Sequence, residues 1–306
     1  MKTNTKKIII MMLAVILIAA LAACNNAPAQ TAEPPATPPP ATSAPEPAPA
    51  TETEITGSVT TAGSTSVQPV SDELAMVFED MHPGVTVDVQ GGGSGQGVKA
   101  VQEDLVDFGA LSRELKDEER AIITADYVIA KDGIAIVANH NVDVDGLSLE
   151  QLKAIFTGEI TNWSEVGGAS AKIEVIAREE GSGTRDAFNE LTGVLGPNAS
   201  GDNVDNTVDS AIIQGSTGAI VTTVGSTENS IGYISLGSLN DNVKALNVEG
   251  VAPSNATVLN GSYKVSRPFI YITARNLSPA AQAFIDFVMG AEGQAVVQEM
   301  GFIPVN

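Results

Sequence analysis

The sequence has few of the residues on which metal sites and many enzyme sites depend. Its 306 residues contain one cysteine, one tryptophan and two histidines. A single cysteine excludes an internal disulfide and a cysteine-based zinc site. His82 and His140 are far apart, and neither has a cysteine or histidine neighbour at metal-ligand spacing. We therefore expect neither a bound metal nor a cofactor.

Basic residues are also scarce. The chain has 16 lysines and arginines against 37 aspartates and glutamates, which gives a formal net charge of −21. Nucleic-acid binding needs a basic face, so this balance excludes that class of partner. A small anionic ligand remains compatible with it, because local donors decide binding in a buried site and salt screens distant charges beyond about 8 Å.

Long apolar runs are absent except at the N-terminus. Three lysines precede an unbroken run of 13 apolar residues from Ile8 to Ala20. This run is short for a membrane span, which needs about 20 residues, and is typical of a secretory signal. Residues 1–24 end in Leu-Ala-Ala-Cys, which resembles the lipobox of bacterial lipoproteins. The resemblance implies lipidation of Cys24 and a position at the cell membrane, facing outside the cytoplasm.

Residues 25–56 are mostly alanine, proline, threonine and glutamate. Such a composition cannot bury enough apolar surface to offset the entropy lost on ordering. We expect an extended tether that holds the remaining chain near the membrane, and a processed pro-segment is the alternative.

From residue 57 to residue 306 the pattern alternates between strands and helices, which indicates an α/β fold. The continuous apolar runs at 134–138 and 269–272 are typical of strands that are covered on both faces. Ser278 and Pro279 form a cap and first-turn pair and predict the start of a helix.

The most informative segment is 178–184, Arg-Glu-Glu-Gly-Ser-Gly-Thr. It follows a strand-like run and precedes a helical pattern, which puts Ser182, Gly183 and Thr184 at a helix N-terminus. Free N–H groups and the helix dipole favour an anion there, and Arg178 adds a bidentate cation. The alternative is an ordinary capped loop with surface charges.

Two other turns have the same chemistry. Residues 63–66 and 91–97 each follow a strand-like run and lead into a helical pattern. The second turn is not a dinucleotide fingerprint, because Gln96 stands where the third glycine should fall. Each turn alone is a weak signal. Three such turns in one chain favour a shared oxyanion site.

These turns belong to a set of segments with a family resemblance. The segments are 62–69, 93–99, 106–113, 155–163, 178–184 and 301–305. In this order they resemble the substrate-binding proteins of bacterial phosphate ABC transporters, over essentially all of 57–306. The resemblance implies a type II periplasmic-binding-protein fold, with two α/β lobes joined by two hinge crossings around a ligand cleft. Lobe 1 would comprise 57–138 and 264–306, and lobe 2 would comprise 139–263.

The resemblance also implies a function. The protein would be a monomer that binds inorganic phosphate outside the cytoplasmic membrane and delivers it to the permease and ATPase of an ABC importer. The implied ligand contacts are Thr65, Ser66, Ser94, Ser112, Arg178, Ser182, Gly183 and Thr184.

Ser112 departs from the family pattern. Many members carry an aspartate there, which accepts the proton of hydrogen phosphate and repels sulfate, whereas a serine hydroxyl can also donate. Arg113 either adds a second positive group or is a solvated residue at a helix start, and we favour the second interpretation.

Several other functions remain open. A receptor for sulfate or molybdate would use the same donors, and an adhesin or signalling protein could reuse the fold. A phosphate-ester hydrolase is less favoured, because Gly181-Ser182-Gly183 is not the Gly-x-Ser-x-Gly elbow and neither histidine has an evident triad context. We therefore expect a binding protein and no enzymatic activity.

Overall fold

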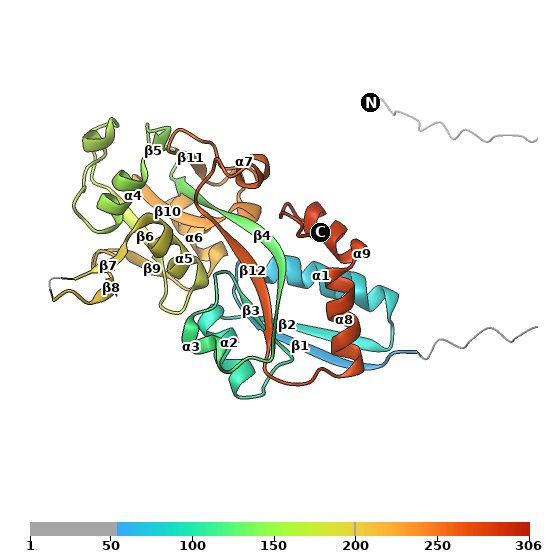
Figure 1. Ribbon diagram of the computed structural model, residues 1–306. Helices are drawn as coiled ribbons and strands as arrows, with labels where there is room; N and C mark the ends of the chain where they lie inside the picture. The colour runs from blue at the N-terminus through green and yellow to red at the C-terminus, as the bar shows by residue number, and fades with distance from the viewer. Residues whose placement is uncertain (1–53, 199) are drawn as a thin grey trace, which may run out of the picture. The chain divides into compact units, whose positions relative to one another are not determined.

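The computed structural model describes residues 54–198 and 200–306. The predicted signal sequence, Cys24 and nearly all of the predicted tether lie outside these residues. Helices and strands alternate along the described chain, which confirms the α/β class (Figure 1). None of the helices in this part combines the length and the apolar character that crossing a membrane requires.

The structure assigns the following strands and helices. The strands are β1 (Gly57–Gly63), β2 (Val85–Gly91), β3 (Phe108–Leu111), β4 (Ala125–Ala138), β5 (Gly146–Leu147), β6 (Glu174–Arg178), β7 (Leu195–Pro197), β8 (Asn203–Asp205), β9 (Ile212–Gln214), β10 (Ser230–Ser235), β11 (Lys244–Val248) and β12 (Ser266–Thr273). The helices are α1 (Gln68–Met81), α2 (Ser94–Gln102), α3 (Asp117–Arg120), α4 (Leu149–Phe156), α5 (Gly183–Thr192), α6 (Thr217–Ser226), α7 (Asn255–Leu259), α8 (Pro279–Met289) and α9 (Ala291–Glu299). Two short 3-10 helices are η1 (Trp163–Val166) and η2 (Leu236–Ser238).

The principal sheet has the strand order β2-β1-β3-β12-β4-β10-β6-β9. β1 pairs in parallel with both β2 and β3, and α1 and α2 make the connections between them. β6 likewise pairs in parallel with β9 and β10. Because the carboxyl ends of parallel strands meet at one edge, the turns after β1 and β2 lie together, and so do the turns after β6 and β9.

Two long strands join two groups of elements. β4 pairs with β12 over residues 125–133, with β10 over residues 134–138 and with β11 over residues 136–138. Ile129 of β4 packs in a core with β1, α1 and α8, whereas Ile134 packs in another core with α4, α5 and β10. Figure 1 shows β4 and β12 side by side between the two groups. We call the group with β1–β3, α1–α3, α8 and α9 the first half, and the group with β5–β11 and α4–α7 the second half.

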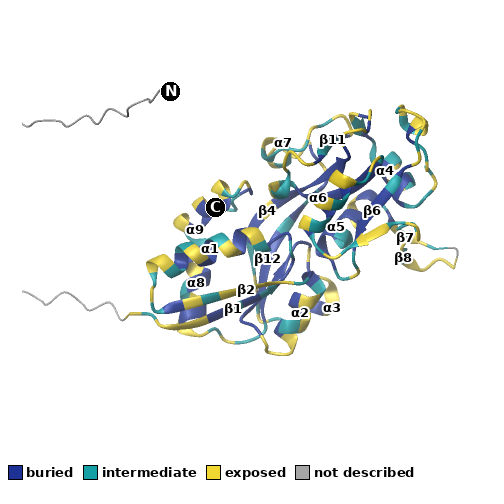
Figure 2. Ribbon diagram, turned by 180° about the vertical axis from the view of Figure 1, so that it is seen from behind, coloured by how far each residue is buried: buried dark blue, intermediate teal, exposed yellow. Residues whose placement is uncertain are grey.

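The second part of β4 shows why its apolar run is continuous. Ile134 and Ile136 contribute to one core of the second half, while Ala135 and Val137 contribute to the core under α6. Successive strand residues point to opposite faces, so a strand covered on both faces needs apolar residues throughout. This confirms the prediction for 134–138, and Figure 2 shows β4 and β12 as largely buried strands.

The predicted helix start at Ser278 is also confirmed. The Ser278 Oγ accepts a hydrogen bond from the Ala281 N–H at 3.1 Å, and Pro279 is the first residue of α8. A side-chain oxygen at this position satisfies an N–H that lacks a partner inside the helix. This start places Phe284 and Ile285 in the core of the first half.

Candidate functional site

Four strand-turn-helix segments meet at one place in the structure. Three are the turns that the sequence predicts, after β1, β2 and β6, and the fourth lies between β9 and α6. Hydrogen bonds between their side chains and backbones connect the two halves. The predicted convergence of the three turns is therefore observed, and a fourth turn joins them.

Buried hydroxyl groups form the centre of this meeting point. The Ser66 Oγ lies 2.9 Å from the Thr184 Oγ1 and 2.8 Å from the Thr217 Oγ1. Ser66 comes from the first half, and the two threonines come from the second. All three residues are at most 3% exposed. Each hydroxyl can donate as well as accept, so the group can rearrange around an oxyanion that needs donors.

Arg178 supplies the positive charge of the site. It ends β6, is 2% exposed, and donates from Nη2 to the Thr65 Oγ1 at 3.0 Å and from Nη1 to the Thr217 Oγ1 at 3.2 Å. The neighbouring Glu179 accepts from Nε and Nη2, both at 2.7 Å. This bidentate pairing fixes the plane of the guanidinium. Sequence reasoning did not anticipate Glu179 as its partner.

The backbone of Arg178 is held by a tyrosine. Its N–H donates to the Tyr233 hydroxyl at 3.2 Å, and the Tyr233 ring stacks on Phe188 with centroids 4.1 Å apart. Burial raises the pKa of Tyr233 above its usual range, so this residue is a neutral acceptor. The arginine is thereby anchored in the core of the second half.

Three serines of the first half form a connected chain. The Ser64 hydroxyl donates to the Ser112 Oγ at 2.7 Å, and the Ser112 N–H donates to the Ser94 Oγ at 3.1 Å. All three are at most 3% exposed. Ser94 is the first residue of α2, so the helix begins within the predicted turn 91–97 and not after it. Ser112 therefore lies beside the second turn, among hydroxyl groups.

The N-terminus of α5 touches the N-terminus of α2. Ser182 caps α5, and its Oγ accepts from the Arg185 N–H at 3.3 Å, as the sequence predicts. The Gly181 carbonyl accepts from the Gly95 N–H at 3.0 Å. A Cβ on Gly183 would overlap the Ser94 hydroxyl. Glycine is therefore required at position 183 for the two halves to approach this closely.

Thr217 is the member of this cluster that sequence reasoning missed. It is 3% exposed, and its N–H donates to the Thr65 Oγ1 at 3.2 Å. Ser216 caps α6 by accepting from the Ala219 N–H at 3.1 Å. The available signal was the segment 215–218, Gly-Ser-Thr-Gly, which follows an apolar strand run and precedes a helix like the other three turns.

Arg113 differs from its prediction. It is 5% exposed, so the interpretation as a solvated residue is wrong. Its Nη1 and Nη2 donate to the two carboxylate oxygens of Glu119, at 2.7 and 2.6 Å. The physical reason is that α3 brings Glu119 back over the end of β3, which neither residue signals on its own.

The chemistry of the site is that of anion binding. It combines hydroxyl donors, helix N-termini and one arginine. His82 packs against the Phe78 ring with centroids 4.5 Å apart, and His140 Nε2 lies 3.0 Å from the Asp241 carbonyl oxygen. Within 54–198 and 200–306, no group of three or more histidine, cysteine or acidic residues is suited to a metal ion.

Comparisons with known proteins identify the fold. Residues 48–292 match the sequence profile of the PBP superfamily domain. A crystal structure of a putative phosphate ABC transporter substrate-binding protein from Clostridium perfringens, with bound phosphate, is 41% identical with a TM-score of 0.77 and is matched over 82% of this chain and 100% of that chain. The fold is therefore that of the type II periplasmic binding proteins, as the sequence predicts.

Two named relatives identify the family within this superfamily. The phosphate-binding protein PstS of Bacillus subtilis is 31% identical over 259 residues, which are 83% of each chain. The phosphate-binding protein PstS 2 of Streptococcus pneumoniae is 50% identical over 136 residues, 44% of this chain and 46% of that protein. That second match spans about half the length of each protein. The chain belongs to the family of phosphate ABC transporter substrate-binding proteins.

Proposed function

We propose that this protein binds inorganic phosphate outside the cytoplasmic membrane and delivers it to the permease and ATPase of an ABC importer. The observation that carries the proposal is the buried cluster of hydroxyls from both halves around Arg178. The Clostridium perfringens relative with bound phosphate supports the choice of ligand.

The proposed ligand set extends the predicted one by a single residue. It comprises Thr65, Ser66, Ser94, Ser112, Arg178, Ser182, Gly183, Thr184 and the newly recognised Thr217. A tetrahedral dianion has four oxygens, each able to accept several hydrogen bonds, and hydroxyl and N–H groups supply these in a dry site.

We take the two halves as the basis of the proposed lobes. The sequence predicts lobe boundaries at 138/139 and 263/264. Packing of 134–138 in the cores of the second half favours a first crossing several residues earlier, near Asp132. Closure is then stabilised because a bound phosphate contacts both lobes at once.

Anchoring, assembly and the absence of catalysis are part of the same proposal. Cys24 carries the lipid, and residues 25–56 act as the tether of a monomeric receptor. Replacing Cys24 with alanine should release the protein from the membrane fraction. Hydrolysis of a chromogenic phosphate ester by the purified protein would contradict the assignment as a binding protein.

Calorimetric titration of the whole protein with phosphate, arsenate, sulfate and molybdate tests the ligand assignment. Phosphate should bind most tightly, with arsenate nearest to it because its shape and protonation are similar. Tighter binding of sulfate or molybdate would instead support a receptor for another oxyanion. No heat of binding with any of the four would reject the function.

A further inference from the structure

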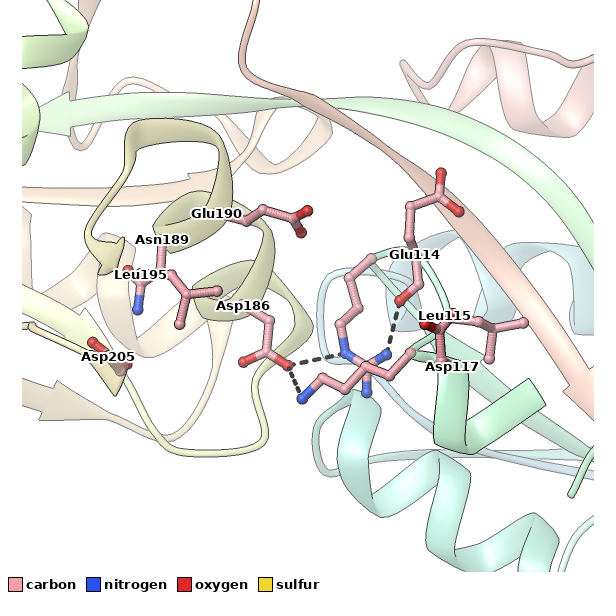
Figure 3. Close-up of a pocket in the computed structure, with 10 residues that line it drawn as sticks. Glu114, Leu115, Asp117, Asp186, Asn189, Glu190, Leu195 and Asp205 are labelled. Atoms are coloured by element: carbon pink, nitrogen blue, oxygen red, sulfur yellow. Dashed lines mark hydrogen bonds and ion pairs between the residues drawn. The ribbon is translucent and has the colours of Figure 1, made fainter. Parts of the chain in front are cut away.

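An ion-pair cluster joins the two halves beside the oxyanion turns. The Asp186 Oδ2 lies 3.0 Å from the Arg113 Nε and 3.2 Å from the Lys116 Nζ. Asp186 is in the first turn of α5, two residues after Thr184, and Arg113 directly follows Ser112. Figure 3 shows the Asp186 side chain between α5 and the first half. Asp186 lines a cavity of about 420 Å³ there. The cluster therefore connects segments that also carry the site.

Arg113 has partners within the first half that do not involve Asp186. Both oxygens of Glu119 hold its Nη1 and Nη2, and Nη1 also donates to the Glu114 carbonyl at 2.8 Å. Burial raises the pKa of Glu119, but hydrogen bonds from Arg113 and from the Lys116 N–H outweigh this and lower it overall. Opening the halves would leave Arg113 paired with Glu119, so no isolated buried charge opposes the motion.

The contact to Asp186 is mainly Coulombic. The Arg113 Nε is close to the Asp186 Oδ2 but is not aligned for a hydrogen bond. Lys116 is 50% exposed and Asp186 is 29% exposed, so salt reaches and screens this contact. The ion pair of Asp186 can therefore form and break with a small change in free energy.

We propose that the Asp186 bridge to Arg113 and Lys116 is a closure latch that slows phosphate release without contacting the phosphate. The inference rests on the proposed function, since it concerns how long the same site stays closed. Asp186 is thus a positioning residue, because it holds the two halves together from outside the hydroxyl cluster.

The direction in which one substitution changes phosphate affinity distinguishes this latch from a purely electrostatic effect of Asp186. A carboxylate close to an anion site repels the anion, so electrostatics alone predicts that Asp186→Asn tightens phosphate binding. A latch predicts the opposite. Ion pairs of this exposure correspond to about a three- to fivefold change in affinity. We expect Asp186→Asn to weaken phosphate binding by this factor, mostly through faster release.

Glu190→Gln is the matched control. Glu190 is also on α5, lines the same cavity, and has no ion pair among the residues that the structure describes (Figure 3). Glu190→Gln removes the same charge as Asp186→Asn and should leave the phosphate affinity within about twofold of the wild-type value. Lys116→Gln tests the pairing: its effect should be smaller in the Asp186→Asn background than in the wild type, because the two residues share one interaction.

The measurements are calorimetric affinity, release of labelled phosphate, and X-ray scattering of the phosphate-free protein, at about 0.05 M and about 0.5 M salt. The latch predicts that wild-type affinity falls with salt more steeply than that of Asp186→Asn, and that the variant is more open without phosphate. If the wild type binds phosphate and Asp186→Asn binds equally or more tightly, the latch is wrong and the proposed function stands. If the wild type does not bind phosphate, the proposed function itself fails.

Discussion

Arg178 is the cation of a site whose other predicted members are uncharged. Its guanidinium donates to Thr65 of the first half and to Thr217 of the second. The Glu179 carboxylate also accepts from the guanidinium. In a buried site such a group is both a donor and a charge, and hydrogen bonds to charged partners are stronger than neutral ones. Phosphate affinity should therefore depend more on this residue than on any single hydroxyl.

Arg178→Ala should weaken phosphate binding more than tenfold, because it removes the charged donor and leaves the Glu179 carboxylate unpaired near the anion. Calorimetric titration measures the change. Lys172→Ala is the control, since it removes an equal charge from a side chain that is 71% exposed and pairs with Glu174 at the surface. Unchanged affinity in Arg178→Ala would remove this residue from the site.

At the scale of elements, the N-termini of several helices approach one another closely at the site. α2 and α5 meet end to end, with Gly183 against Ser94, and α6 directs its first residue at the same place. The N-termini of several helices thus face one region, where their dipoles favour a negative charge. α2 and α5 can approach this closely only because position 183 carries no side chain.

Gly183→Ala should lower phosphate affinity at least tenfold, because the added methyl group prevents α5 from reaching α2. Alanine is no worse a helix former than glycine, so the phosphate-free variant should be about as stable to heat as the wild type. Gly218→Ala is the matched control: it lies in the first turn of α6, where a Cβ meets open space. Equal phosphate affinity in wild type and Gly183→Ala would show that this contact does not limit binding.

At the scale of the whole body, the two halves are linked where β4 and β12 run together. A buried ion pair lies there, with the Asp132 Oδ2 3.1 Å from the Arg267 Nη2 and both side chains 1% exposed. Burial raises the pKa of Asp132 and lowers the pKa of Arg267 to about 10, while their mutual attraction opposes both shifts. Each charge therefore depends on the other.

Asp132→Asn should lower the free energy of unfolding by about 3 to 5 kcal/mol, because it leaves the Arg267 charge buried without a partner. Denaturant unfolding of the phosphate-free protein measures this. Asp145→Asn breaks an exposed pair with Lys244, in which the aspartate is 94% exposed, and should cost less than about 1 kcal/mol. Similar losses in both variants would mean that burial does not set the strength of the Asp132 pair.

The comparison of prediction and structure is clearest at particular residues. Ser182 and Ser278 were predictable as caps, because capping depends on residues within one turn of the chain. Thr217 could have been found by the same rule and was overlooked. Arg113 could not have been, since its burial depends on Glu119 and on Asp186, which reaches it from the other half.

The amino-acid sequence by itself determined the α/β alternation, the apolar strands and the strand-turn-helix positions, because each depends on neighbours a few residues apart. Only the tertiary structure decided which turns meet, and which charges pair across the boundary. Ser66 and Thr217 are 151 positions apart and touch through the strand order of the sheet. Contacts at such separations follow from chain topology, which no local pattern encodes.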